Sequence, residues 1–243
     1  MAANSAELVA GTGPEQAYIM ALTLKAIELA KSAVAHTIDG LAQKSSAPFK
    51  AVNQCEQELD RLDREVDERV TDAVIQASSP QARELLACMK FVIDLERIGD
   101  LVASFGGCAQ AIGARIGMDD VKDLTQMATV LEQMLGNIHD AFSSRNLDGV
   151  VSVIRGDAVL DRIRNLIFIR HVEDNEGTAG QEDIHVLFMA QALERAGDHT
   201  KNLAEEICHL VTGQTMRHVL RSQSKSEEQM YIEWLRGRQK LEK

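Results

Sequence analysis

The sequence contains few of the residues that interrupt helices or build β-sheets. Only 3 of its 243 residues are proline, and aromatic residues make up only 4% of the chain. Proline ends or kinks helices, whereas aromatic and β-branched residues are enriched in strands. Alanine, leucine, glutamate and glutamine, which favour helices, are abundant instead. This composition argues against a β-rich fold and predicts an all-α protein.

The sequence also lacks the features that define several other classes of protein. The longest uncharged apolar runs fall short of the roughly 18–20 residues that span a bilayer. Residues 1–13 have neither the basic start nor the continuous apolar segment of a signal peptide. The net charge of −11 disfavours binding to nucleic acid and to anionic lipid, both of which use basic clusters. The sequence therefore predicts a cytoplasmic protein, without direct membrane insertion, that attracts cations.

Motifs of nucleophilic catalysis and of nucleotide binding are also missing. The sequence has no nucleophile elbow, no P-loop and no plausible dinucleotide fingerprint. His36, His139 and His171 occur singly, and we expect them on surfaces or at the edges of the core. The four cysteines have no CxxC or zinc spacing, so we expect free, buried thiols: Cys55, Cys88, Cys108 and Cys208.

A pentapeptide that occurs twice dominates the sequence. Residues 96–100 (ERIGD) recur 98 positions later as residues 194–198 (ERAGD). Residues four apart lie one turn apart on the same face of a helix, so each copy pairs two carboxylates. Both copies follow nearly continuous apolar segments, which are typical of buried helices. The glycine in each copy indicates a place where another backbone or a ligand comes close.

Apolar residues at helical spacing predict six long helices. Pro14, Pro48 and Pro80 each stand just before one of the first three, where proline is tolerated. Asp119 is the predicted N-cap of the fourth helix, and Gly213 the C-cap of the last. Gly106-Gly107 predicts a kink or a flexible break in the third. The expected ranges are 15–44, 49–77, 81–116, 119–144, 147–173 and 181–212.

A second pair of acids precedes each pentapeptide. Helix 49–77 contains Glu56 and Asp60, and helix 147–173 contains Asp157 and Asp161. The repeat predicts two tandem, pseudo-symmetric three-helix bundles. Because the second and third helices of such a bundle are neighbours, we expect four carboxylates to cluster in each half. The predicted limits are 15–117 for the first bundle, 119–217 for the second and 218–243 for a short C-terminal tail.

Clustered carboxylates repel one another unless they are protonated or bound to a cation. Oxygen-only ligation suits Mg²⁺, Mn²⁺ or iron better than structural zinc, and His199 could add a nitrogen ligand or a supporting hydrogen bond. The duplication and the apolar surroundings favour cation sites. The alternative is an ion-pair lattice with nearby arginines, namely Arg61, Arg97, Arg162 and Arg195.

Two Glu-x-x-His pairs, of the kind that di-iron proteins place on two different helices, also occur. They are Glu182 with His185, and Glu206 with His209. Both lie on the same predicted helix, 24 residues and therefore roughly 36 Å apart. They cannot share a metal within one chain, so we expect surface residues.

The two copies of LERxGD, the second continuing as residues 198–205 (DHTKNLAE), resemble the PhoU family of phosphate-uptake regulators. Residues 213–218 (GQTMRH) are similar to the family's ending, and the resemblance covers about residues 15–220. It implies metal ions (iron, manganese, magnesium or zinc), including multinuclear clusters, at the acidic motifs. It also implies a cytoplasmic homodimer, peripheral at the inner membrane through its partners. Those partners would be the ATPase of the phosphate ABC transporter and a sensor histidine kinase, and together they would repress the phosphate-starvation response.

The resemblance assigns metal ligands residue by residue. After Asp100 the first half departs from the family pattern, because Leu101, Ser104 and Gly107 stand where the family tends to have histidine, asparagine and glutamate. We therefore expect the second cluster to be richer in ligands. The implied ligands are Glu194, Asp198, Asn202, Glu205, Asp157 and Asp161 in the second half, and Asp94, Glu96, Asp100, Glu56 and Asp60 in the first.

Three classes of function are compatible with these features. A non-enzymatic regulator that docks on a transporter complex is the leading hypothesis. A carboxylate-bridged metalloenzyme would need open coordination positions and a polar substrate pocket. A metal-free helical scaffold would hold its acids in salt bridges. Few nucleophiles or aromatic residues lie near the motifs, which favours the regulator over the enzyme.

Overall fold

A computed structural model describes residues 13–43, 45–173 and 180–213, which form helices and short connections without any strand. The six predicted long helices are confirmed, and most of their ends lie within a few residues of the predicted ones. A 3₁₀ turn, η1 (Gly113–Arg115), follows the third helix, and a π-helical turn, η2 (Ile169–Glu173), follows the fifth. The long helices are α1 (Pro14–Gln43), α2 (Ala47–Val74), α3 (Ser79–Ile112), α4 (Met118–Ser144), α5 (Val150–Phe168) and α6 (Gln181–Thr212).

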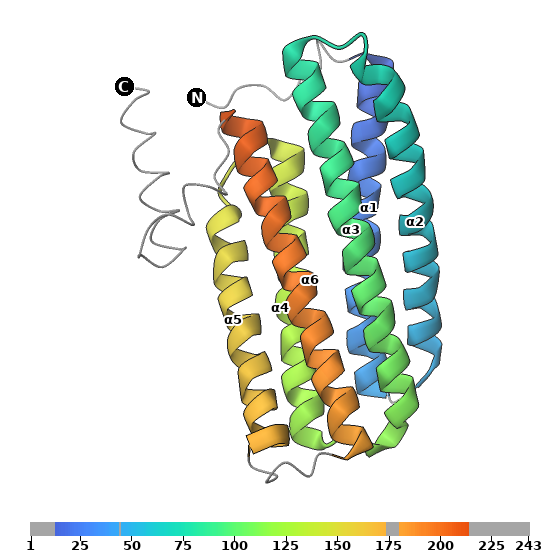
Figure 1. Ribbon diagram of the computed structural model, residues 1–243, viewed down its shortest axis with the longest axis vertical. Helices are drawn as coiled ribbons and strands as arrows, with labels where there is room; N and C mark the ends of the chain where they lie inside the picture. The colour runs from blue at the N-terminus through green and yellow to red at the C-terminus, as the bar shows by residue number, and fades with distance from the viewer. Residues whose placement is uncertain (1–12, 44, 174–179, 214–243) are drawn as a thin grey trace.

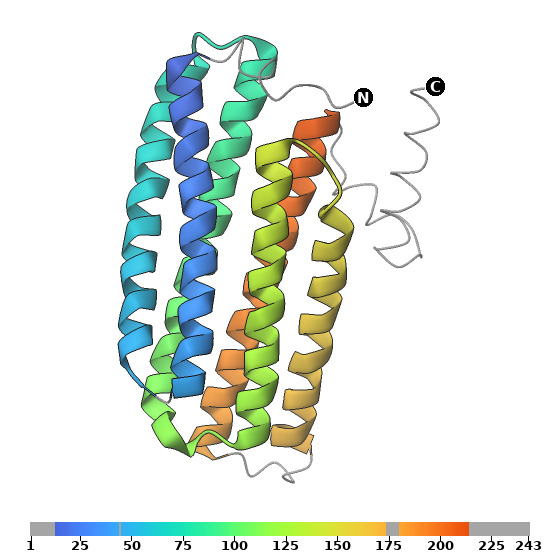
Figure 2. The same cartoon turned by 180° about the vertical axis from the view of Figure 1, so that it is seen from behind.

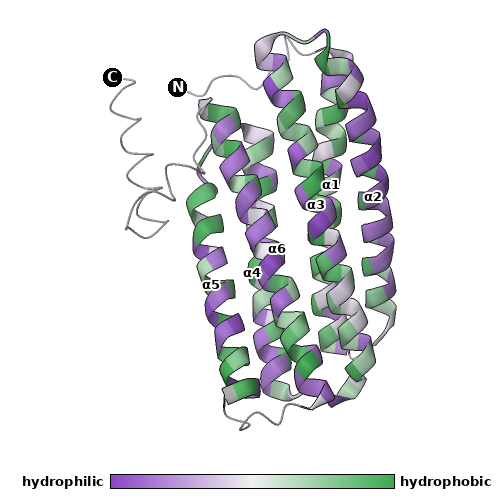
Figure 3. Cartoon of the chain, viewed as in Figure 1, coloured by the Kyte–Doolittle hydropathy of each residue, from purple (hydrophilic) through white to green (hydrophobic). Residues whose placement is uncertain are grey.

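The helices form two antiparallel groups of three that pack side by side. In Figure 1, α3 and α6 lie in the centre of the near face, and Figure 2 shows α1 and α4 in the centre of the opposite face. The halves join where α3 packs against α6 and α1 packs against α4. α2 and α5 lie at the outer edges and contact mainly helices of their own half, and α2 has a largely polar outer surface (Figure 3).

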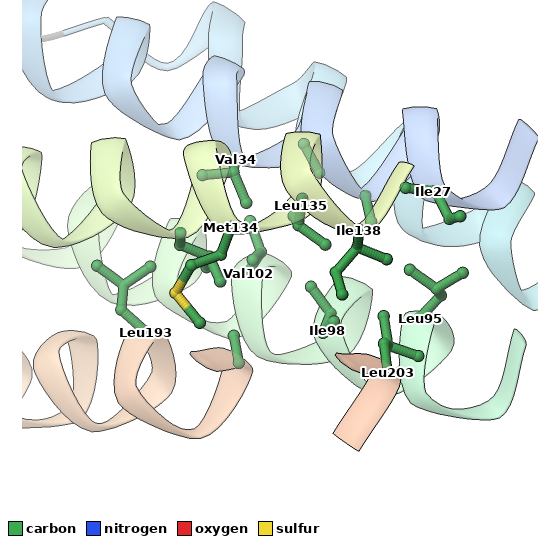
Figure 4. Packing of buried hydrophobic residues seen from close by; sticks show 14 of the residues in the cluster. Ile27, Val34, Leu95, Ile98, Val102, Met134, Leu135, Ile138, Leu193 and Leu203 are labelled. Atoms are coloured by element: carbon green, nitrogen blue, oxygen red, sulfur yellow. The ribbon is translucent and has the colours of Figure 1, made fainter. Parts of the chain in front are cut away.

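One apolar core passes through both halves. Its buried side chains come from all six long helices and form a single cluster. The close view in Figure 4 shows α1, α3, α4 and α6 contributing side chains to the same region. The predicted boundary near residue 118 coincides with the turn from η1 into α4, but the core continues across it. The side chains labelled in that view include Ile27, Val34, Leu95, Ile98, Met134, Leu135 and Leu193.

Two local predictions were wrong, and a third element differs in detail. Gly106-Gly107 does not break α3, which continues to Ile112. Gly106 is buried, and a Cβ there would lie 3.3 Å from the ring of Phe49, so the small residue permits close helix packing. Gly117, not Asp119, is the N-cap of α4, and Asp119 lies in its first turn. The predicted helix 147–173 changes to π-helical geometry after Phe168.

Other local predictions are confirmed. Gly213 ends α6 with a left-handed φ of 72°, and its N–H donates to the carbonyl of His209 at 2.7 Å. All four cysteines are free, and three are buried as expected, whereas Cys108 is only partly buried. Burial raises the pKa of the Cys88 thiol to about 11. None of the helices in the described ranges is long and apolar enough to cross a membrane. The tail 218–243 lies outside the described residues.

Candidate functional site

Four of the five acids predicted for the first half, all except Asp94, come together between α2 and α3. A Cβ on Gly99 would lie 2.7 Å from Cδ1 of the buried Leu59 and 3.7 Å from the Cα of Glu56, so the glycine lets the two helices approach closely. We define the first acidic group as the carboxylates that interact electrostatically across this contact: Glu56, Asp60 and Asp63 on α2, and Glu96 and Asp100 on α3.

Burial and mutual repulsion disfavour the ionised form of this group. Burial, followed by the negative charges of Asp60 and Asp100, raises the pKa of Glu56. Burial and then Asp100 likewise raise the pKa of Glu96, against the opposing effect of Arg97. The guanidinium of Arg97 lies 3.3 Å from Glu96 and 3.4 Å from Asp100, but its side chain is 58% exposed. Arg97 and Arg64 also oppose the rise in the pKa of Asp63 that burial causes. Two arginines thus face five carboxylates, and the group retains a net negative charge.

The second half has the equivalent arrangement between α5 and α6. The second acidic group is Asp157 and Asp161 on α5 with Glu194 and Asp198 on α6. A Cβ on Gly197 would overlap the Cδ1 methyl of the buried Leu160. Each pentapeptide glycine is therefore a contact point for a leucine of the preceding helix, and this contact positions the acids. The clustering that was expected from the sequence is present in both halves.

Basic side chains neutralise much of the second acidic group. Lys201 donates to the buried Asp157 at 3.0 Å, and Arg164 donates to Glu194 at 3.1 Å and lies 3.7 Å from Asp161. Burial still raises the pKa of Asp157, while Lys201 lowers it. The first group has one more acid, and its Arg97 is 58% exposed whereas Lys201 is 17% exposed, so it carries the larger uncompensated charge, although the sequence suggested that the second group would bind cations better.

Asp94 and Asn202 lie at the contact between α3 and α6, and not in the acidic groups of the first and second halves where they were expected as ligands. Nδ1 of His199 lies 2.7 Å from Oδ1 of Asp94, and Asn202 donates to the same oxygen at 3.5 Å. Residues two apart on a helix point in nearly opposite directions, so Asp94 faces α6 while Glu96 faces α2. Together these three side chains form a polar bridge between α3 and α6.

The remaining predicted residues are placed as follows. Glu205 is half-buried on α6, two turns beyond Asp198. Arg61 does not join the acidic groups but pairs with Glu58 and Glu65 on α2. The two Glu-x-x-His pairs lie near opposite ends of α6, where Glu182 pairs with Arg115 at 2.7 Å and Glu206 pairs with Lys90 at 3.0 Å.

The donor chemistry of the first acidic group fits a hard divalent cation. Carboxylate oxygens are the ligands that Mg²⁺ and Mn²⁺ prefer, and a bound cation would relieve the repulsion described above. As the side chains lie, no three acids, histidines or cysteines among the described residues converge at a metal-binding position, so binding would require side-chain rotation. In the second group, Lys201 and Arg164 would have to leave their partners first.

The sequence interpretation missed both of these basic residues, although helical spacing would have identified them. Arg164 follows Asp161 by three positions, and Lys201 follows Asp198 by three, so each lies on the same helix face as an acid of the group. Their closest partners, Glu194 and Asp157, are on the neighbouring helix. Two cavities, of about 500 and 490 Å³, lie near opposite ends of the first half. Neither is lined by a member of either acidic group.

The comparisons with known proteins agree with this architecture. Residues 23–106 and 124–207, one segment in each half, match the PhoU domain. A phosphate-specific transport system accessory protein PhoU homolog of Caulobacter vibrioides is 29% identical over 210 residues, which cover 84% of this chain and 91% of the relative. A Burkholderia homolog of the same description is 26% identical over 211 residues, covering 83% and 88%.

Solved structures show the same fold. PhoU from Pseudomonas aeruginosa superimposes with a TM-score of 0.73 at 23% identity, covering 82% of this chain and 98% of that one. The phosphate transport system regulatory protein PhoU from Streptococcus pneumoniae gives a TM-score of 0.75 at 17% identity, covering 83% and 97%. Because the two domain matches together cover more than half of the sequence, this chain belongs to the PhoU family.

Proposed function

We propose that this protein is a non-enzymatic regulator of phosphate uptake that acts as an accessory to a phosphate ABC transporter. The observation that carries the proposal is the pair of PhoU domain matches, which together include both acidic groups. The curated relatives are described as accessory proteins of the phosphate-specific transport system. By analogy, the partners are the transporter ATPase and a sensor histidine kinase, and the outcome is repression of the phosphate-starvation response when phosphate is plentiful.

The acidic groups are the proposed point of contact with cations and partners. They lie along the contacts between α2 and α3 and between α5 and α6, on either side of the central pair α3 and α6 (Figure 1). Mg²⁺, Mn²⁺ or iron bound at the first group would convert a repulsive surface into one that can bridge to acidic or polar groups on a partner. Attachment to the inner membrane would then occur through partner proteins, and a homodimer would present each acidic group twice.

A metalloenzyme is the less favoured alternative, for a structural reason. Catalysis at the carboxylates would require a substrate pocket beside them. The two cavities described above are lined by other residues, whereas the acids lie along helix–helix contacts. A regulator needs only an accessible surface, which half-exposed acids such as Asp100 and Asp198 provide.

The proposal can be tested in cells and with purified protein. In cells whose own copy is replaced, Asp100→Asn and Asp198→Asn should raise expression of a phosphate-starvation reporter under phosphate-rich conditions and weaken capture of the transporter ATPase. Asp140→Asn is the matched control, because Asp140 is an 85% exposed acid on α4, outside both groups. Normal repression without the protein would refute the regulatory role. Normal repression by both acid variants would refute only the role of the acidic groups.

A further inference from the structure

A second polar cluster, unrelated to the acidic groups, lies where α5 ends. The sequence suggested a surface or core-edge position for His171, but this residue of η2 is only 8% exposed. Its Nδ1 lies 2.6 Å from Oδ1 of Asp183 on α6, and its Nε2 lies 2.8 Å from Oδ1 of Asp120 on α4. One imidazole ring thus connects three segments of the second half.

The geometry fixes the number of protons on this ring. An ionised carboxylate only accepts hydrogen bonds, so a ring nitrogen at this distance from one must donate. Both nitrogens of His171 face carboxylate oxygens, and only the imidazolium form carries two N–H groups. A neutral ring would leave one nitrogen lone pair facing a carboxylate, and one of the two hydrogen bonds would be lost.

The charged groups around the ring reinforce this requirement. Asp120 faces it from α4 and Asp183 faces it from α6. Arg170 in η2 donates to Asp120 and to Asp123, a second acid of α4. Burial lowers the pKa of His171, but hydrogen bonds to Asp120 and Asp183 raise it, and the net shift is upward. With the ring protonated, two positive charges face three negative ones.

Loss of the ring's proton would affect the ends of two helices. Asp183 also accepts a hydrogen bond at 2.7 Å from the backbone N–H of Gly180, the N-cap residue of α6. Asp120 lies in the first turn of α4. His171 therefore ties the end of α5 to the first turns of both neighbouring helices. The tied segments also carry exposed apolar side chains, among them Phe168 on α5 and Phe188 on α6.

We propose that His171 is a proton-dependent clasp that releases the end of α5 from α4 and α6 when its ring loses a proton. The closed state holds η2 in its π-helical geometry, and opening frees η2 and the first turn of α6 together. The arrangement of the exposed apolar side chains at this end of the second half, such as Phe168 and Phe188, would then depend on pH. It does not depend on cation binding at the acidic groups, so the two ideas can fail separately.

The direct test is a titration of the full chain by NMR combined with hydrogen exchange. The His171 ring should titrate above the ordinary value of about 6.5. After correction for intrinsic exchange, protection of residues 165–173 and 181–190 should fall by about tenfold per pH unit between the ordinary value and the His171 titration, and level off above that titration, as expected for opening linked to one proton. His171→Gln should remove this pH dependence. His139→Gln is the matched control, because His139 lies beside Glu28 and Asp140 on the surface and should leave the dependence intact.

Two results would overturn the clasp. One is titration of His171 at or below the ordinary value, and the other is protection of both segments that does not change with pH. Asp183→Asn provides an independent measurement should His171→Gln fail to fold, since asparagine also serves near helix N-termini. It removes one facing charge and should shift the His171 titration downward, and an unchanged titration in this variant would also refute the proposal.

Discussion

The glycine of the first pentapeptide allows a quantitative test of how α2 and α3 are held together. In Gly99→Ala the new Cβ would lie 2.7 Å from Cδ1 of Leu59, whose side chain is buried and has little room to move. Overpacking of this kind costs about 1–3 kcal/mol, whereas alanine is better than glycine in a helix by about 0.8–1 kcal/mol. The expected net loss of unfolding free energy is therefore about 1 kcal/mol, or about 2–4 °C in Tm for a chain of this size.

The matched control is in the same helix. Gly107 is exposed, and a Cβ built on it meets nothing within 4 Å. Gly107→Ala should therefore gain the helix-propensity term alone and raise the unfolding free energy by up to about 1 kcal/mol. Urea unfolding followed by circular dichroism measures both variants under the same conditions. The two substitutions are chemically identical, so opposite signs would isolate the contact with Leu59.

Truncation of Leu59 tests the same contact from the α2 side. Leu59→Ala alone should cost about 2–5 kcal/mol, because it leaves a cavity in the core. In that background the new Cβ of Gly99→Ala has room, and the substitution should become stabilising, with a coupling energy of about 1–2 kcal/mol. If Gly99→Ala and Gly107→Ala stabilise the protein equally, or if no coupling with Leu59 is found, the glycine is not a packing requirement and this account of the motif is wrong.

Three further predictions concern the acidic groups. Lys201→Met should lower the unfolding free energy by about 1–3 kcal/mol at pH 7, because it leaves the buried Asp157 without this donor. The loss should be smaller at about pH 4, where Asp157 is protonated more readily, and urea unfolding at both pH values measures the difference. Burial and then repulsion by Asp100 raise the pKa of Glu96 in the folded state, so ionising Glu96 costs stability as pH rises above its unfolded value of about 4.3. Asp100→Asn removes the repulsion and should be more stable than the natural protein at pH 7, and urea unfolding should show this advantage shrinking towards pH 4. Mn²⁺ at about 100 times its Kd should raise the unfolding free energy by about 2.7 kcal/mol. In thermal unfolding, Asp100→Asn should lose more of this gain than Asp198→Asn, and the reverse order would contradict the assignment of the stronger site to the first group.

Local and periodic features of this protein were predictable from its sequence. Apolar spacing identified the six helices, because buried faces repeat with the helical period. The acids at positions 96 and 100 share a helix face whatever the tertiary structure, and the duplicated motif indicated that the second and third helices of each half are neighbours. The clustering of acids between α2 and α3 therefore followed from the sequence.

The contacts that were missed depend on packing between distant segments. The bridge from Asp94 to His199 joins residues 105 positions apart and requires the crossing of α3 and α6. Long basic side chains such as Lys201 have several candidate partners along a helix, and packing selects among them. The burial of His171 depends on η2, a π-helical turn for which the sequence shows no distinctive pattern. Such features require the assembled fold.

The core that α1, α3, α4 and α6 share has a consequence for each repeat on its own. If the protein were cut at the turn between α3 and α4, each repeat would expose the apolar side chains that now pack against the other. Exposed apolar surface of that extent drives association. A solitary repeat would therefore be stable only by pairing with a second copy through the same helix faces. In the present protein each repeat fills this role for the other, because α4 packs against α1 and α6 packs against α3.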